Sequence, residues 1–223
     1  MKIIEIKILS GPNLWSVNRP NLVEMKLDID EFESLPNNLI DGFNERLNKL
    51  IPSFYSNRCS EGSKGRFLRR LIKGTWMGHI IEHFALKPQG LAGMERGFGR
   101  TRSTGNFGEY YVVFSYDLPR AGVVAAKSAV RLVESLANAG PFDLETCVAE
   151  LRAITAVEAA KARDIPWRRL DEGSFIQFGY GAHLRRIRAT LADSTSNIGV
   201  EVVQDEFLAK KILQVAPTAE IGK

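Results

Sequence analysis

Two histidines and a glutamate stand close together in GTWMGHIIEHFAL, residues 74–86. His79 and His83 are four residues apart and Glu82 lies between them, which gives the pattern H-x-x-E-H. On an α-helix, residues three or four apart share a face, so these side chains would project side by side. Two imidazoles and a carboxylate are typical donors for a catalytic zinc ion. The pattern is the inverted form of the zinc-protease motif H-E-x-x-H.

The spacing predicts His79 and His83 as metal ligands and Glu82 as the catalytic residue. Zinc would lower the pKa of a bound water to about 7, and Glu82 would act as its general base or as a further ligand. A catalytic zinc needs a third protein ligand, and no local spacing identifies it. The acidic candidates are Glu61, Glu95, Glu109, Glu150 and Glu158.

The same stretch is also compatible with an ordinary packed helix. Trp76, Ile80 and Phe84 recur at helical spacing and mark an apolar face. A histidine and a glutamate at the edge of such a face can form hydrogen bonds and a surface pair without any metal. The sequence leaves both interpretations open.

Residues 93–108, GMERGFGRTRSTGNFG, form a segment rich in glycine and arginine that we expect to be a loop. Its arginines are Arg96, Arg100 and Arg102. Guanidinium groups suit carboxylates and phosphates, so the segment indicates an anionic ligand, with a solvated surface loop as the alternative. No phosphate-binding motif G-x-x-x-x-G-K-[ST] occurs in the chain.

Hydrophobic patterning predicts the elements that must position these residues. Strands are expected at 2–9, with Ile4, Ile6 and Ile8 on one face, and at 22–30 and 110–117. Helices are expected at 42–51, 65–74, 75–94, 121–140 and 143–164. Thr75 and Asp143 are the expected N-caps, and Pro88 should kink or end its helix.

We place a domain boundary near 164–165, which divides the chain into units 1–164 and 165–223. The second unit should be rich in strands, with a hairpin turn around Tyr180 and a closing helix from about Asp205. It is short and has few apolar residues, so we expect it to bury too little apolar surface to fold without the rest of the chain. The fold class is α/β in the broad (α+β) sense, a small mixed sheet packed by helices and followed by a short incomplete segment.

Composition places the chain among ordinary globular proteins, with 44% hydrophobic residues, 25% charged residues and a formal net charge of +4. Since no run of five like charges occurs, no nucleic-acid partner is expected. No apolar run approaches the roughly 20 residues that cross a bilayer, so no membrane association is expected either. The charged N-terminal stretch and the two distant cysteines, Cys59 and Cys147, predict a cytoplasmic protein.

Several stretches, in order, resemble the N-terminal domain of cyanophycin synthetases. They are GPNLWS, GFNERLNKLIPSFYSNRCSEG, GTWMGHIIEHFAL, LAGMERGFGRTR, YYVVFSY and AGVVAAKSAVRLV. Residues 165–202, which begin IPWRRLDEGSF, resemble the start of the ATP-grasp domain of that family. The resemblance covers nearly the whole chain.

The resemblance implies a role with cyanophycin, a storage polypeptide made by joining aspartate at the backbone end and arginine, by an isopeptide bond, at the aspartate side chain. It implies that this region binds the polymer, here through Arg96, Arg100, Arg102 and Trp76. The alternatives are a zinc-dependent hydrolase that trims the polymer into primers, and an inactive truncated relic. A full-length synthetase or a second copy of the chain would be a partner by the same analogy.

Several features depart from the family pattern. The sequence ends at LQVAPTAEIGK without a main nucleotide cleft or a ligase phosphate loop, so ATP is not expected to bind this chain alone and ligation is not expected. Lys87-Pro88 follows the histidine motif where the family usually has an acid and leucine, and Ser115 stands where it usually has an acid. If that second acid helps to build a metal site, the site is weaker here.

Overall fold

The structure, a computed structural model, describes residues 1–51, 66–94, 97–171, 174–188, 191–192 and 194. Within them the chain forms two four-stranded sheets and five α-helices. The first sheet has the order β1-β2-β4-β3, with bounds β1 Lys2–Leu9, β2 Leu22–Asp28, β3 Gly99–Ser103 and β4 Glu109–Ser115. The second has the order β5-β6-β7-β8, with bounds β5 Trp167–Arg169, β6 Ile176–Phe178, β7 Arg185–Arg188 and β8 Leu191–Ala192.

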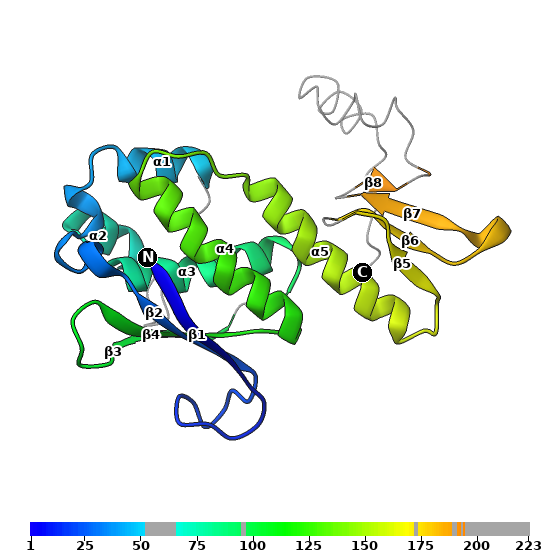
Figure 1. The fold of residues 1–223 in the computed structure, drawn as a ribbon, viewed down its shortest axis with the longest axis horizontal. Helices are drawn as coiled ribbons and strands as arrows, with labels where there is room; N and C mark the ends of the chain where they lie inside the picture. The colour runs from blue at the N-terminus through cyan, green and yellow to red at the C-terminus, as the bar shows by residue number, and fades with distance from the viewer. Residues whose placement is uncertain (52–65, 95–96, 172–173, 189–190, 193, 195–223) are drawn as a thin grey trace, which may run out of the picture.

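The helices form a layer on one face of the first sheet (Figure 1). They are α1 Phe43–Leu50, α2 Arg66–Lys73, α3 Met77–Leu91, α4 Pro119–Ala137 and α5 Leu144–Lys161. α3 and α4 pack against each other and against the sheet, and α5 leads from this layer to the second sheet. No helix among the described residues has the length and apolar character to cross a membrane.

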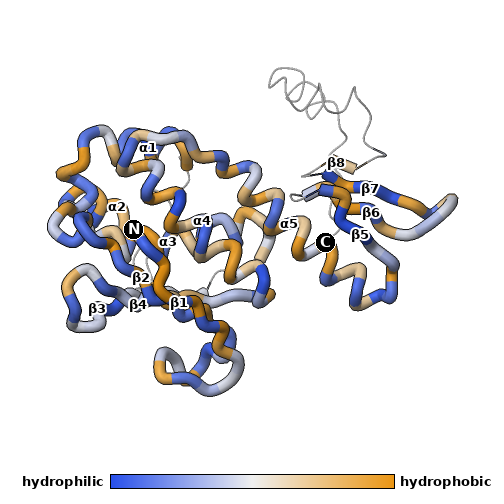
Figure 2. Tube along the Cα trace, viewed as in Figure 1, coloured by the Kyte–Doolittle hydropathy of each residue, from blue (hydrophilic) through white to orange (hydrophobic). Residues whose placement is uncertain are grey.

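The main core lies between the first sheet and these helices, where hydrophobic segments gather (Figure 2). β2 shows why this side is buried, because Val23, Met25 and Leu27 alternate with charged residues and are fully inaccessible to solvent. From the helices, Ile80 and Phe84 complete the packing. Burial of such side chains contributes about 1.5–3 kcal/mol each.

The expected face of β1 is wrong at one position. A bulge shifts the pairing of β1 with β2 between Ile3 and Glu5, so the inward side changes along the strand. As a result Ile3, Ile6 and Ile8 pack against the core, whereas Ile4 is 43% exposed. Strict alternation cannot anticipate this shift, because one extra residue exchanges the two faces.

The strand directions correct a second expectation. All pairings within the described residues are antiparallel, so the sheets are not mixed. Short connections such as 104–108 between β3 and β4 can join only antiparallel neighbours. The segment 93–108 is therefore not all loop, since β3 lies inside it and pairs with β4 along its whole length.

The helix boundaries mostly follow the predictions, with exceptions around α3. Gly74 separates α2 from α3 with φ of 100°, a conformation that glycine adopts at low cost. The N-cap is Trp76 rather than Thr75, and α3 continues through the buried Pro88 to Leu91 instead of ending there. At α5 the prediction is confirmed, because the Asp143 side chain accepts a hydrogen bond from the Thr146 backbone N–H.

The second sheet shares a small core with α5. Ile176 of β6 is fully buried against Ala153 and Val157 of α5, and Trp167 packs beside them. This packing explains how a segment with few apolar residues is supported. The hairpin turn at 179–184 is confirmed between β6 and β7, whereas the helix expected from Asp205 lies outside the described residues. The division at 164–165 stays a prediction.

The bulge in β1 makes two isoleucines of one strand energetically unequal. We expect Ile6→Ala to lower the free energy of unfolding by about 2 kcal/mol, and Ile4→Ala by about 0.5 kcal/mol, because only Ile6 loses core contacts. Urea unfolding of both variants measures the difference. Equal losses, or a larger loss for Ile4, would contradict the register described here.

Candidate functional site

The histidine motif forms a tight cluster on α3. One donor atom from each of His79, Glu82 and His83 lies within 4.8 Å of the others. The two imidazole rings are edge-on, with centroids 4.7 Å apart, and His79 Nδ1 is 3.6 Å from Glu82 Oε2. The helical spacing therefore brings the three predicted residues together. Their role as metal ligands stays a prediction.

The Glu82 carboxylate is buried between α3 and β3. Its Oε2 accepts a hydrogen bond of 2.9 Å from the Thr101 hydroxyl, while its Oε1 has no hydrogen-bond partner among the described groups. Gly99 makes this approach possible, because a Cβ there would lie 2.5 Å from Glu82 Oε1. A buried acceptor without a partner is costly unless a ligand, ion or water meets it.

α2 packs against the two histidines, as β3 packs against Glu82. The Phe67 ring packs on His83, with centroids 3.9 Å apart, and the Arg70 Nη1 lies 3.5 Å from His79 Nε2. Sequence reasoning missed Phe67, Arg70, Gly99 and Thr101. No spacing rule links α2 or β3 to α3. The only local hint was a glycine within a segment that looked like a loop.

Burial makes His83 a neutral imidazole at neutral pH. The pKa of His83 is lowered to about 3, first because burial penalises the charged ring and then because His79 and Arg70 lie nearby. A neutral ring is the form that binds a metal ion. His83 is therefore already in the state that a ligand requires.

The cluster opens into a cleft of about 460 Å³ between α3 and β3. Its walls come from Arg70, from Trp76 at the N-cap of α3, from His79 and Glu82 of α3, and from Phe98 and the following residues 99–102 of β3. Trp76 is half exposed at its rim. His83 does not line the cleft, because it is buried behind His79 and Phe67.

The arginines predicted to bind polymer flank the cleft. Arg100 and Arg102 line it through β3, and their side chains alternate with Thr101, which points toward α3. The Arg102 guanidinium lies over the Trp15 ring and Arg100 over Phe98, on the face of the sheet away from the helices. Arg96 lies outside the described residues.

Five glutamates were predicted as candidates for a third metal ligand. Those that lie within the described residues are not part of the cluster. Glu109 pairs with Lys26, Glu158 pairs with Lys161, and Glu150 lines a different cavity beside α5. Glu61 and Glu95 lie outside the described residues. Within the described part of the chain, Glu82 itself supplies the third donor.

Ser115, the position where the resemblance leads us to expect an acid, is not part of this cluster. Its hydroxyl accepts a hydrogen bond from the Phe98 N–H, and the residue lines a separate cavity of about 130 Å³. The substitution therefore leaves the three donors around Glu82 in place.

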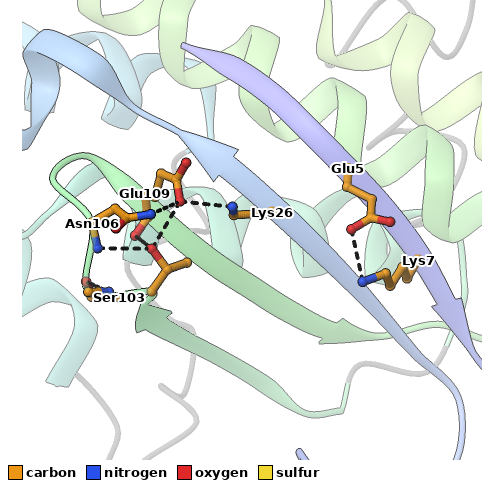
Figure 3. A network of polar contacts seen from close by, with 8 residues as sticks. Glu5, Lys7, Lys26, Ser103, Asn106 and Glu109 are labelled. Carbon is orange, nitrogen blue, oxygen red and sulfur yellow. Dashed lines mark hydrogen bonds and ion pairs between the residues drawn. The ribbon is translucent and has the colours of Figure 1, made fainter.

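The outer face of the first sheet carries charges of both signs. Glu5 pairs with Lys7 at 2.9 Å, and Glu109 pairs with Lys26 at the same distance (Figure 3). The pKa of Glu109 is lowered, chiefly by the hydrogen bond from Asn106 and then by the one from Lys26. This face can offer both anionic and cationic groups to a ligand that carries both charges.

The donor set fits a metal ion such as zinc. Two imidazoles and one carboxylate match the ligand types of catalytic zinc sites, and Glu82 Oε1 is the orphaned atom that an ion or its water would satisfy. His79, His83 and Glu82 would hold the ion. The open cleft beside them would admit a substrate.

Comparison with known proteins gives a consistent result. The family model described as "Cyanophycin synthase-like N-terminal domain" matches residues 24–138. The chain is 42% identical to a cyanophycin synthetase of Geminocystis herdmanii and 43% identical to one of Synechocystis sp.. These alignments cover 97% of the chain and 26% of each relative, so the chain spans about a quarter of the length of the curated relatives it matches.

The lowered pKa of His83 predicts a loss of stability in acid. The folded-state pKa of His83 is about 3 and the unfolded value is about 6.5. Below pH 6.5 the unfolded chain therefore binds a proton that the folded chain does not, so the free energy of unfolding falls as the pH drops from 6.5 toward 3. Between pH 6 and pH 4.5 we expect a loss of about 2 kcal/mol from this residue. Urea unfolding with a chelator present measures it.

The variant His83→Gln is the control for this prediction, because it cannot titrate. Between pH 6 and pH 4.5 its free energy of unfolding should fall by about 2 kcal/mol less than that of the unaltered protein. Identical pH profiles for both proteins would show that His83 is not held neutral by burial.

Proposed function

The chain belongs to the family of cyanophycin synthase-like N-terminal domains, and from this we propose that it acts in cyanophycin biosynthesis by binding the polymer. The observation that carries the proposal is the cleft between α3 and β3. It joins Trp76, Arg100 and Arg102, which the sequence pointed to separately, to the histidine cluster.

The charged groups beside the cleft and on the adjoining outer face of the sheet suit a polypeptide of aspartate and arginine. When arginine is joined to an aspartate side chain through its α-amino group, each unit keeps a carboxylate and a guanidinium. Arg100 and Arg102 can pair with the carboxylates. Glu109 and Glu24, on the outer face of the same sheet, can pair with guanidinium groups.

The two arginines of β3 should supply a measurable part of the affinity. We expect Arg100→Ala with Arg102→Ala to weaken binding of a soluble aspartate–arginine oligomer about tenfold, because two charge-assisted contacts are lost. Calorimetric titration at low salt measures the change.

The control removes two exposed arginines elsewhere, Arg120 and Arg163, and so changes the net charge equally. Affinity should then change less than twofold. Equal weakening in both double variants would mean that net charge, and not the cleft, attracts the oligomer. An absence of binding by the unaltered protein would overturn the proposed function.

A second candidate function is metal-dependent hydrolysis of the same polymer. Two observations favour hydrolysis. Three candidate metal ligands lie together beside a cleft, and Glu82 Oε1 has no hydrogen-bond partner among the described groups. A bound zinc ion would supply an activated water at neutral pH. Thr101 would orient the carboxylate through Oε2, which leaves Oε1 to bind the ion or to take a proton.

Metal content tests this candidate directly. We expect about one zinc per chain in protein equilibrated with zinc, and its loss when His79 and His83 are both replaced by alanine. His183, the third histidine, is exposed and outside the cluster, so His183→Ala should keep the metal.

Glu82→Gln then separates the two roles of the carboxylate. Reduced metal content would identify Glu82 as a ligand, whereas retained metal with lost cleavage would identify it as the base. Zinc that is absent from the unaltered protein, or unaffected by the double replacement, would end the hydrolase candidate and leave polymer binding untouched.

A further inference from the structure

β3 is the edge strand of the first sheet, and the cleft runs along it. The strand order β1-β2-β4-β3 leaves one side of β3 without a neighbouring strand among the described residues. Residues 98–102 line the cleft consecutively, so the main chain of the strand forms its wall. A strand edge carries N–H and C=O groups that can pair with another chain.

The hydrogen bonds fix which residues of β3 offer these groups. The Phe98 carbonyl accepts from the Ser115 N–H, and the Thr104 N–H donates to the Glu109 carbonyl, so the even-numbered residues face β4. In an antiparallel ladder alternate residues point their backbone groups to opposite sides. The backbone groups of Gly99, Thr101 and Ser103 therefore point away from β4, and those of Thr101 and Ser103 form the accessible part of this edge, because Gly99 is buried against Glu82.

We propose that an extended polypeptide carrying carboxylates binds by adding a fifth strand along Gly99–Ser103. This inference rests on the proposed function, since it names how the polymer backbone would be held. Main-chain hydrogen bonds to Thr101 and Ser103 would give affinity without regard to side chains, as in other cases of strand addition. β3 is about 16 Å long at the usual rise per residue.

The side chains around the edge match such a ligand. Neighbouring strands lie about 4.8 Å apart, so outward-facing side chains of an added strand would stand beside Arg100 and Arg102. Carboxylates there would form cross-strand pairs. Its other side chains would face the cleft wall at Trp76 and His79, and one of its peptide groups would lie beside Thr101, the residue that binds Glu82.

Amide hydrogen exchange followed by NMR tests the proposal on the unaltered chain. In the free protein the amides of Thr101 and Ser103 should exchange faster than those of Arg100 and Arg102, which donate to β4. Saturation with an oligomer of aspartate–arginine units should slow these two odd-numbered amides at least tenfold. The even-numbered amides, already bonded to β4, should change less.

The outcomes separate this inference from the proposed function. Binding by calorimetry with no slowing of the odd-numbered amides would overturn strand addition while polymer binding stands. An absence of binding would overturn both. Slowing of all β3 amides equally would mean general stabilisation of the strand, and would also count against strand addition.

A proline at the edge provides a second test. Ser103→Pro removes an edge N–H and blocks the approach of a strand, and proline is tolerated on edge strands when its nitrogen faces outward. Affinity for the oligomer should fall at least fivefold, whereas Ser103→Ala, which keeps the N–H, should bind within twofold of the unaltered protein. Circular dichroism confirms that both variants fold, and equal affinities would overturn the inference.

Discussion

The burial of one carboxylate between a helix and an edge strand sets the arrangement of the whole cleft. Glu82 is almost completely buried, and its hydrogen bond from Thr101 joins α3 to β3. Removal of a carboxylate from water is costly, so the strand must approach closely and supply a donor. Gly99 permits the approach and Thr101 supplies the donor. The positions of His79 and the cleft wall follow from this contact.

The surrounding packing keeps the cluster in a form that is ready to bind. α2 covers His83 with Phe67, and burial keeps that imidazole neutral. The arginines of β3 stand on the opposite face of the strand, so their charges do not lie against the histidines. Preorganised groups lose less freedom on binding, which favours affinity for an extended charged ligand. α3 provides the candidate metal ligands, while β3 provides a strand edge and the two flanking arginines.

Most of the framework could be predicted from periodicity, but the site could be predicted only in part. Strong alternation in β2 and the cap at Asp143 identify their elements, and helical spacing alone places His79 beside His83. β3 escaped prediction because a strand of GRTRS lacks alternating apolar residues and depends on pairing with β4. Phe67 and Arg70 could not be foreseen, because tertiary packing brings them to α3 from a separate helix.

We expect the polymer to lie along the cleft between α3 and β3, and a crystal structure of the chain with a bound aspartate–arginine oligomer would show its position. The oligomer should be extended along Gly99–Ser103, with carboxylates beside Arg100 and Arg102. An oligomer bound only elsewhere, for example in the cavity beside α5 lined by Glu150 and Arg188, would contradict it.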